Sequence, residues 1–329
     1  MKIKRKSIVK LRWGAAGCGN FTEFGFLPAL NQLKRSKLIS VYSSDINRAK
    51  SIATKFNAEA GYNNYSEFLQ SNINAVYIGS RNSDHHSQVI QAAEAGKNIL
   101  CEKPIALNSA QAEEMVKACE ENNVFLAINF VHRFHPLSYK ANEIINKGML
   151  GKIVSVSVNF NVDYPPNNNF RFKKEQSGGG ALRDIGTHMI DLLRFFGGEI
   201  TDVKGFVDNI VYKSEVDDFS AAVLKYKKGG YGQFNVSFNN PKAFNRIEIL
   251  GYNGCISIEN IIGGSKKAGK LTINLKGEGK KAFRRRANKQ LVLLRSIQKS
   301  FIKNEQPEIT GNDGLINMRI MEELEQQCL

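Results

Sequence analysis

The chain has 329 residues, a formal net charge of +15 and a hydrophobic content of 42%. A chain of this length is too long for a single hydrophobic core and is expected to form two domains. No run of 18 apolar residues occurs, so we expect neither a membrane-spanning helix nor a membrane partner. The basic N-terminus leads into an apolar stretch too short for a signal peptide, so we expect a cytoplasmic protein.

The five cysteines are scattered along the chain and contain no C-x-x-C pair. This pattern argues against a disulfide framework or a zinc site and fits a reducing compartment. Residues 266–299 hold twelve Lys or Arg residues against one acid, Glu278. A nucleic-acid patch is one interpretation, and a solvated helix face is the other. Aromatic residues do not interleave with these cations, so we expect no nucleic-acid partner.

The first 130 residues alternate short apolar runs with amphipathic stretches, which predicts a parallel, doubly wound α/β sheet. Asp84 and Ser109 are expected helix caps, and Gly96 an expected helix stop. The expected strands are 9–16, 38–43, 75–79, 98–101 and 124–128, and the expected helices are 21–32, 47–56, 83–95 and 109–121.

The pattern changes near residue 130, which divides the chain into predicted domains 1–130 and 131–329. A helix at 136–147, a polar loop at 163–180 and a helix at 181–196 are expected. Successive strands without intervening helices indicate an open, mostly antiparallel sheet in an α+β second domain. Its expected strands are 153–160, 203–211, 218–226, 231–238, 245–250, 255–258 and 271–275, followed by helical patterns near 284–303 and 312–327.

The first strand ends in Gly14-x-x-Gly17-x-Gly19, directly before a helix. Gly17 permits a tight turn, and Gly19 lets the backbone approach a pyrophosphate, which the helix N–H groups then hold. A plain glycine turn is the alternative, but a strand before and a helix after favour a dinucleotide site. Cys18, Asn20 and Phe21 complete this predicted loop.

The end of the second strand bears on the choice of cofactor. An NAD site usually places a carboxylate there for the ribose 2′-hydroxyl. Ser43 stands at that position, Ser44 follows, and Asp45 comes two residues late. Serines leave room for a 2′-phosphate and Arg48 adds charge, so NADP is slightly favoured over NAD.

Three segments together resemble the Gfo/Idh/MocA oxidoreductase family, which includes glucose-fructose oxidoreductase and inositol dehydrogenase. They are the glycine turn, the run 92–104 that ends in Glu102-Lys103-Pro104, and the run 178–188, Gly-Gly-Gly-Ala-Leu-Arg-Asp-Ile-Gly-Thr-His. Residues 129–136 and 148–153 also look like family segments, so the match runs nearly from end to end.

The resemblance implies a Rossmann domain, a second domain whose open sheet builds homodimers or homotetramers, an NAD(P) cofactor and a sugar, cyclitol or related substrate. It also suggests a cis peptide bond before Pro104. Arg81 departs from the family, whose members often carry proline there. By the same resemblance Ser80, Arg81, Asn82, His85, Glu102 and Lys103 are expected at the cofactor.

Lys103 is the expected proton carrier, because a lysine in a partly desolvated cleft can exchange protons near neutrality. Asp184 and His188 are four residues apart on one helix face, and the resemblance places both beside the lysine. His188 is expected to bond the reacting oxygen and relay the proton. No third ligand has plausible spacing, so we expect no metal.

The substrate contacts are harder to predict, because substrate choice varies in the loop 163–180. The candidates are Arg133, Tyr164, Arg171 and Asp191. The guanidinium of Arg171 and the positive net charge of the chain favour an anionic sugar derivative as substrate. The sequence therefore predicts an oxidoreductase that interconverts a secondary alcohol and a ketone, with hydride transfer at nicotinamide C4. Two alternatives stay open, which are redox-assisted glycoside cleavage on the same fold and a non-catalytic NAD(P)-sensing regulator.

Overall fold

The computed structural model describes residues 11–263 and 267–328, and the chain forms two compact units. Among the described residues, unit 1 comprises 11–105, 111–129 and 290–312. Unit 2 comprises 106–110, 130–263, 267–289 and 313–328. The segment 290–312 thus belongs with unit 1, although it follows most of unit 2 in the sequence. The division into functional domains at residue 130 stays a prediction.

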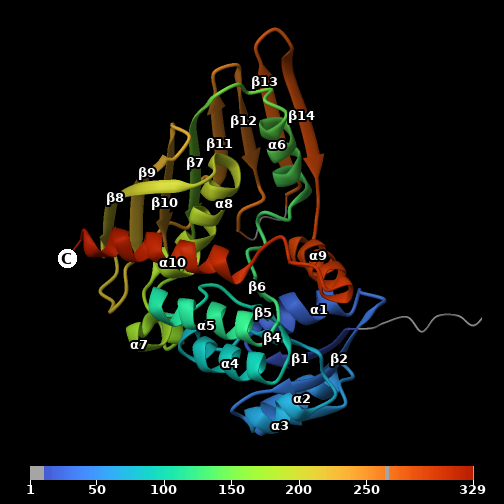
Figure 1. The fold of residues 1–329 in the computed structure, drawn as a ribbon. Helices are drawn as coiled ribbons and strands as arrows, with labels where there is room; N and C mark the ends of the chain where they lie inside the picture. The colour runs from blue at the N-terminus through green and yellow to red at the C-terminus, as the bar shows by residue number, and fades with distance from the viewer. Residues whose placement is uncertain (1–10, 264–266, 329) are drawn as a thin grey trace, which may run out of the picture. The chain divides into compact units, whose positions relative to one another are not determined.

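Unit 1 is built on a six-stranded parallel sheet in the order β3-β2-β1-β4-β5-β6 (Figure 1). This order reverses between β1 and β4, which is the switch point where doubly wound sheets bind ligands. The strands are β1 (Leu11–Ala16), β2 (Ser36–Tyr42), β3 (Ala60–Tyr62), β4 (Ala75–Ile78), β5 (Asn98–Cys101) and β6 (Leu126–Ile128). The predicted parallel, doubly wound sheet is confirmed.

The helices of unit 1 begin and end where local chemistry dictates. Asp45 caps the first turn of α2 by accepting from the backbone N–H groups of Asn47 and Arg48. Gly96, with φ +68°, follows α4 in the left-handed conformation, as predicted. The elements are η1 (Thr22–Phe26), α1 (Leu27–Leu30), α2 (Ile46–Lys55), α3 (Tyr65–Gln70), α4 (Asn82–Glu94), α5 (Ser109–Glu121) and α9 (Lys289–Lys303). The first two residues of α5 and the first residue of α9 belong to unit 2.

Unit 2 is built on an eight-stranded sheet in the order β14-β13-β12-β11-β7-β10-β9-β8. Only the β7–β10 pair is parallel among its described pairings, so the expectation of a mostly antiparallel sheet is confirmed. The strands are β7 (Ile153–Asn161), β8 (Ile200–Asp208), β9 (Phe219–Tyr226), β10 (Tyr231–Ser237), β11 (Arg246–Gly251), β12 (Gly254–Glu259), β13 (Gly269–Leu275) and β14 (Gly279–Arg285).

Helices α6 (Pro136–Asn146) and α8 (Thr187–Gly197) pack against this sheet (Figure 1). The strands therefore alternate, with buried side chains toward the helices and exposed ones on the other face, as in β9. Unit 2 also contains η2 (Phe170–Phe172), α7 (Lys174–Ser177), η3 (Leu182–Gly186) and α10 (Gly311–Gln326). No helix among the described residues is long and apolar enough to cross a membrane.

Several expected elements were wrong in detail. The segment 279–285 of the basic region is the strand β14, not a helix face, and β3 and α3 were missed because both are short. The loop 163–180 contains η2 and α7, and the strand expected at 203–211 lies three residues earlier. Asp84 is not the cap of α4, because Arg81 occupies the cap position and Asp84 lies in the first turn. Ser109 is the first residue of α5 rather than a residue before it.

Candidate active site

The glycine turn of unit 1 lies at the carboxyl end of β1. Gly17 has φ +88°, and a Cβ added there would lie 2.5 Å from the carbonyl carbon of Gly79, so only glycine fits. Gly19 differs, because a Cβ added there would meet nothing within 4 Å. Gly14 lies within β1 rather than in the turn, and its missing side chain makes room for the ring of Phe68. The turn thus leaves open space above Gly19, next to exposed Asn20 and Phe21.

The start of α2 braces this turn. Nε and Nη2 of Arg48 donate to the carbonyl oxygen of Cys18 at 3.2 and 3.1 Å, and Arg48 also pairs with Glu23. The carboxylate of Asp45 is engaged in capping α2. The hydroxyl of Ser43 accepts from the backbone N–H of Asp45 at 3.3 Å, and Ser44 is exposed. Serines and an arginine therefore stand where the cofactor ribose is expected.

The loop after β4 continues the same edge of the sheet. The hydroxyl of Ser80 donates to Gln88 at 2.7 Å, Arg81 is exposed, and Asn82 is buried at the start of α4. His85 has no exposed surface, and its Nδ1 lies 3.0 Å from the carbonyl oxygen of Pro104. Burial lowers the pKa of His85, so the ring is neutral near pH 7. His85 thus supports the turn that contains Pro104.

That turn is Glu102-Lys103-Pro104, directly after β5, and its Lys103–Pro104 peptide bond is cis. The hydroxyl of Tyr77 donates to Oε1 of Glu102 at 3.0 Å, and the side-chain amide of Asn129 donates to the same oxygen. The backbone N–H of Lys103 donates to Oε2 of Glu102 at 3.3 Å. Burial raises the pKa of Glu102, against the lowering effect of neighbouring Lys103. A polar network thus fixes the backbone from which Lys103 projects.

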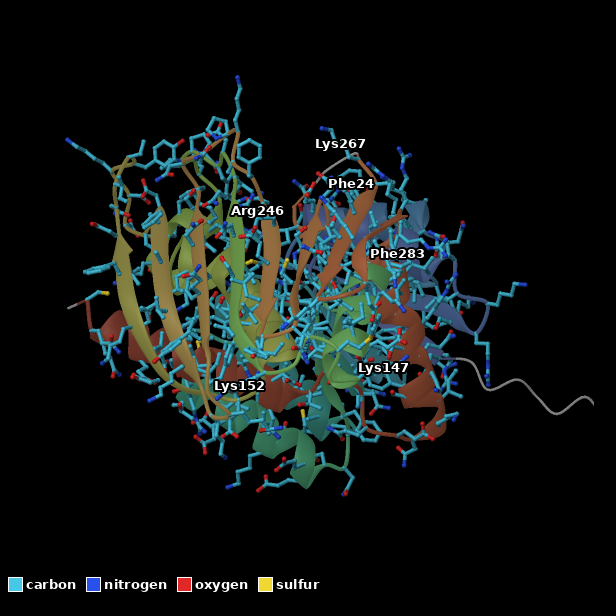
Figure 2. The ribbon with its side chains drawn as sticks, turned by 90° about the horizontal axis from the view of Figure 1, so that it is seen from above. Phe24, Lys147, Lys152, Arg246, Lys267 and Phe283 are labelled. Carbon is cyan, nitrogen blue, oxygen red and sulfur yellow. The ribbon has the colours of Figure 1, made fainter. Side chains whose placement is uncertain are left out.

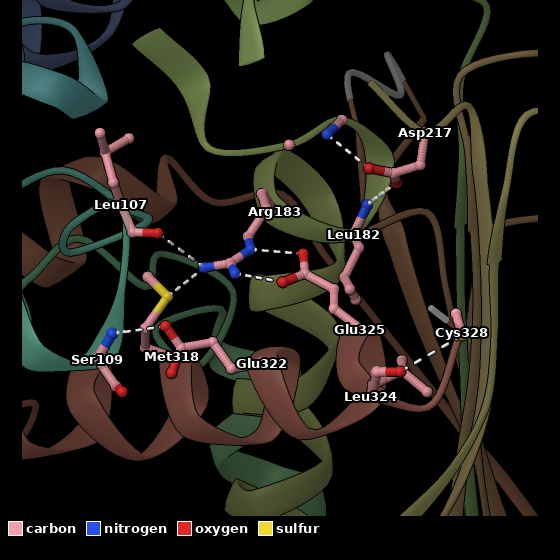
Figure 3. A network of polar contacts seen from close by, with 12 residues as sticks. Leu107, Ser109, Leu182, Arg183, Asp217, Met318, Glu322, Leu324, Glu325 and Cys328 are labelled. Atoms are coloured by element: carbon pink, nitrogen blue, oxygen red, sulfur yellow. Dashed lines mark hydrogen bonds and ion pairs between the residues drawn. The ribbon is translucent and has the colours of Figure 1, made fainter. Parts of the chain in front are cut away.

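The run Gly178-Gly179-Gly180 of unit 2 leads into η3, which carries Asp184. The carboxylate of Asp217 accepts from the backbone N–H groups of Gly180 and Leu182 at 2.7 and 2.8 Å (Figure 3). A Cβ on Gly180 would lie 1.9 Å from the carbonyl oxygen of Asp217, so the close approach requires glycine. Burial raises the pKa of Asp217 to about 6.

Arg183 anchors the same segment from the other side. Its Nε donates to Glu325 of α10 at 2.7 Å, and Nη1 donates to the carbonyl oxygen of Leu107 at 3.3 Å (Figure 3). Nη1 also contacts the sulfur of Met318. The residue that precedes Asp184 is therefore held to α10 by an ion pair that is largely buried on the arginine side.

Three of the residues expected at the site lie together in unit 2. Nε of Arg171 lies 3.4 Å from Oδ2 of Asp184, so the loop residue pairs with the expected catalytic acid. Arg171 also lies over the ring of Phe170. Tyr164 packs against Phe172, in the same short helix as Arg171. The loop is thus connected through an ion pair to η3, which directly precedes the helix α8 that carries His188.

His188 is 7% exposed and lies against two rings of the segment 130–132. The His132 and His188 ring centroids are 4.8 Å apart at an interplanar angle of 85°, and Phe130 lies at 6.1 Å. Among the residues that the structure describes, no group of three or more His, Cys, Asp or Glu side chains can hold a metal ion.

Arg133 and Asp191, both expected near the substrate, form an ion pair with each other. Nε of Arg133 donates to Oδ2 of Asp191 at 2.8 Å, and Nη2 lies 2.5 Å from Oδ1. Nη2 also reaches Asp313 at 3.1 Å. Arg133 is 7% exposed and Asp191 is 1% exposed, which is the arrangement of a structural ion pair. A substrate contact of either residue stays a prediction.

The sequence reasoning missed several residues that support the site. Tyr77 and Asn129 of unit 1 could have been predicted, because they lie at the carboxyl ends of β4 and β6, the two strands that flank β5. Glu23 and Asp217 carry no such signal, because the groups that they bind are 25 or more positions away in the sequence.

Comparison with known proteins agrees with this fold and these motifs. Residues 11–130 match the model of an oxidoreductase family with an NAD-binding Rossmann fold, and residues 139–257 match the GFO/IDH/MocA C-terminal domain. Trans-1,2-dihydrobenzene-1,2-diol dehydrogenase of Mus musculus is 29% identical over 258 residues, which cover 76% of this chain and 75% of that protein. The 1,5-anhydro-D-fructose reductase of Ensifer adhaerens is 27% identical over 310 residues, 92% of each chain.

Solved structures share the fold over nearly the whole length. Levoglucosan dehydrogenase in complex with NADH and levoglucosan has a TM-score of 0.89 at 21% identity, covering 96% of both chains. KijD10, a 3-ketoreductase from Actinomadura kijaniata in complex with NADP, has a TM-score of 0.83 at 22% identity, covering 97% of this chain and 98% of that one. These identities show the fold alone. The family models and the two relatives show that this chain belongs to the Gfo/Idh/MocA family and is an NAD(P)-dependent oxidoreductase.

Proposed function

We propose that this enzyme interconverts a secondary alcohol and a ketone on a sugar, a cyclitol or a sugar derivative. One observation carries the proposal. Lys103 follows β5 at the carboxyl edge of the parallel sheet in which β1 ends in the glycine turn, with β4 between the two strands. Ligands of doubly wound sheets bind beyond this edge at the switch point.

The residues of the glycine turn fit a dinucleotide. The open space above Gly19 admits a pyrophosphate, and backbone N–H groups at Asn20 and Phe21 begin the following helix. When bound, NAD(P) supplies the hydride acceptor or donor at C4 of its nicotinamide. Ser80, Arg81 and Asn82 then border the cofactor, and buried His85 supports it through the turn at Pro104.

We assign the proton step to Lys103 and His188. In the oxidising direction the substrate carbon loses a hydride while its hydroxyl proton passes to the amine of Lys103, which leaves a ketone. His188 hydrogen-bonds the same oxygen and relays the proton, and Asp184 orients the hydroxyl. Arg171, which pairs with Asp184, and Tyr164 contact the rest of the substrate, which favours an anionic sugar derivative.

The polar groups after β2 support a preference for NADP. The carboxylate of Asp45 already caps α2, so it is less available to a ribose 2′-hydroxyl. Ser43, exposed Ser44 and the guanidinium of Arg48 leave room and charge for a 2′-phosphate.

The outer face of the eight-stranded sheet supports homodimers or homotetramers. Phe206 on β8, Val223 on β9 and Leu250 on β11 expose 75%, 48% and 48% of their surface. They alternate with the buried side chains that face α6 and α8, so they lie on the face away from those helices. Large apolar side chains on one face are typical of an interface.

The test is turnover of a sugar panel by the parent, Lys103→Met and Lys97→Met. Lys97 precedes β5 at its amino end, so its replacement is the matched control. We expect absorbance change at the reduced nicotinamide band in the parent and the control, and a loss of at least about 100-fold in Lys103→Met. Net hydrolysis without net change in NAD(P)H would instead indicate glycoside cleavage, and cofactor binding without turnover of any substrate would indicate a sensor.

A further inference from the structure

Lys289 is a half-buried lysine of unit 2 that the proposed reaction does not use. Its Nζ donates to the carbonyl oxygen of Ile261 at 2.6 Å and lies 3.0 Å from Nδ1 of His132. An ordinary solvated lysine has no such fixed partners. The side chain therefore lies inside unit 2, directly against an imidazole.

His132 connects Lys289 to the proposed catalytic histidine. Its ring makes an edge-to-face contact with His188, at 4.8 Å between centroids, and a second one with Phe160, at 5.9 Å. Its carbonyl oxygen accepts from the hydroxyl of Ser138 at 2.9 Å, which fixes the backbone. His132 is 5% exposed, so its protonation is governed by these neighbours rather than by water.

The contact between Nζ of Lys289 and Nδ1 of His132 determines which ring nitrogen of His132 carries the proton. A lysine ammonium has three donors and no acceptor, so Nδ1 has to accept and the ring proton has to lie on Nε2. An imidazolium at His132 would direct an N–H group at the ammonium and bring two positive charges within 3.0 Å. The same cation would also lie against His188, and the two rings would then titrate as a coupled pair.

We propose that Lys289 is a positioning residue, which holds His132 as a neutral imidazole protonated on Nε2 and thereby leaves His188 as the titrating member of the pair. The proposal rests on the proposed function only for its kinetic consequence, because the state of His132 is measurable without turnover.

Other charged groups around His132 are compatible with this role. His135, in the same turn, accepts from the backbone N–H of Leu137 through Nδ1 at 3.1 Å, and burial together with Lys289 lowers its pKa to about 4. Arg133 directs its guanidinium at Asp191 and Asp313. Burial lowers the pKa of Lys289 itself to about 8, so it remains mostly charged at pH 7.

The experiment is ¹H–¹⁵N NMR of the histidine rings in the full-length protein between pH 5.5 and 8. The chain has only five histidines, so His132→Gln and His188→Asn assign the two signals. In the parent we expect a neutral His132 with its proton on Nε2 at pH 7. A proton on Nδ1 in the parent overturns the proposal, and this measurement needs no variant at Lys289.

Three variants test the cause. In Lys289→Met the charge and the donor are lost, and we expect His132 to take up a proton at least one pH unit higher than in the parent, a tenfold change in proton affinity. Lys289→Arg restores the parent state, and Lys289→Gln, which keeps a neutral donor, serves if the methionine variant does not fold. Lys303→Met, on the exposed far end of α9, is the control. An unchanged His132 titration in folded Lys289→Met or Lys289→Gln overturns the proposal.

The kinetic consequence separates this proposal from the proposed function. We expect the pH dependence of kcat to change in Lys289→Met and to return in Lys289→Arg. Full activity of His188→Asn would refute the role of His188 in proton transfer, while the NMR result on His132 would stand. A merely structural role of Lys289 would lower stability without moving the pH profile.

Discussion

The guanidinium of Arg48 holds the carbonyl oxygen of Cys18, the residue between the two glycines of the cofactor turn. Glu23 holds Arg48 in turn and bonds Nζ of Lys55 at 2.5 Å, and these cations lower the pKa of Glu23. The first turns of two helices of unit 1 are thus connected at the place where the cofactor phosphates are expected.

Replacement of Arg48 tests its two proposed roles, as brace of the turn and as contact of a 2′-phosphate. In Arg48→Ala we expect the KM for NADPH to rise at least about tenfold, since charged hydrogen bonds contribute about 1.5–3 kcal/mol. The KM for NADH should rise less. Lys50→Ala, at an exposed position of α2, is the control. Equal increases in the KM for NADPH and NADH would show that Arg48 only stabilises the glycine turn. That result would contradict the proposed preference for NADP.

The two glycines of the turn should respond differently to alanine. Gly17→Ala forces a left-handed residue and a backbone clash, so we expect a loss of at least about 2 kcal/mol in the free energy of unfolding. Gly19→Ala has open space, so stability should change by less than about 0.5 kcal/mol. Its added Cβ occupies the path of the pyrophosphate, so NADP(H) affinity should fall at least about tenfold. Calorimetry gives both quantities, and unchanged affinity in Gly19→Ala would contradict the assigned cofactor path.

Asp217 should give unit 2 a measurable pH dependence. Burial raises its pKa to about 6 from an ordinary 3.8, so between pH 4 and 6 the native state binds more protons than the unfolded state. Stability therefore falls as pH rises through this range. Asp217→Asn removes the titrating carboxyl and with it this pH dependence. The amide also has one acceptor oxygen fewer for the N–H groups of Gly180 and Leu182, which should cost about 1–3 kcal/mol of stability.

The difference in the free energy of unfolding between the parent and Asp217→Asn reports the pH dependence of Asp217 alone, because the other carboxylates are the same in both proteins. We expect the variant to be more destabilised at pH 4.5 than at pH 7, as measured by chemical denaturation at both values. A difference that is constant with pH, or larger at pH 7, would show that the native pKa of Asp217 is not raised.

The outer sheet face should hold the oligomer together. Phe206→Glu places a charge on this face, and we expect light scattering to show monomers where the parent forms dimers or tetramers. Phe24→Glu is the matched control, because Phe24 is a 68% exposed phenylalanine of unit 1. A monomeric parent, or an unchanged assembly of Phe206→Glu, would contradict the proposed interface.

The pattern of apolar runs predicted most of unit 1, because each buried parallel strand is short, continuous and bounded by turn residues. The elements at 60–62 and 65–70 were not predicted, because three to six residues are too few to show a periodic pattern of apolar side chains. The strand β14 was not predicted for another reason. All seven of its residues are exposed at the sheet edge, so no buried side chain marks it. Ala282 and Phe283, the latter labelled in Figure 2, separate its two pairs of cations.

Local motifs allow site residues to be proposed from the sequence, whereas tertiary contacts leave no signal in it. Lys103, Asp184 and His188 were named from local motifs. The partners of Arg133 and Asp191 were not, because a buried ion pair between residues 58 positions apart leaves no local signal. The contacts of Lys289 with His132 are equally non-local, since 157 positions separate them.

The central claim is that Lys103 carries the substrate proton during hydride transfer. The most direct measurement is single-turnover hydride transfer in enzyme preloaded with cofactor, followed by stopped flow for the parent and Lys103→Met. We predict equal cofactor affinity and a hydride-transfer rate at least about 100-fold lower in the variant. A rate within threefold of the parent, with cofactor bound, would contradict the account.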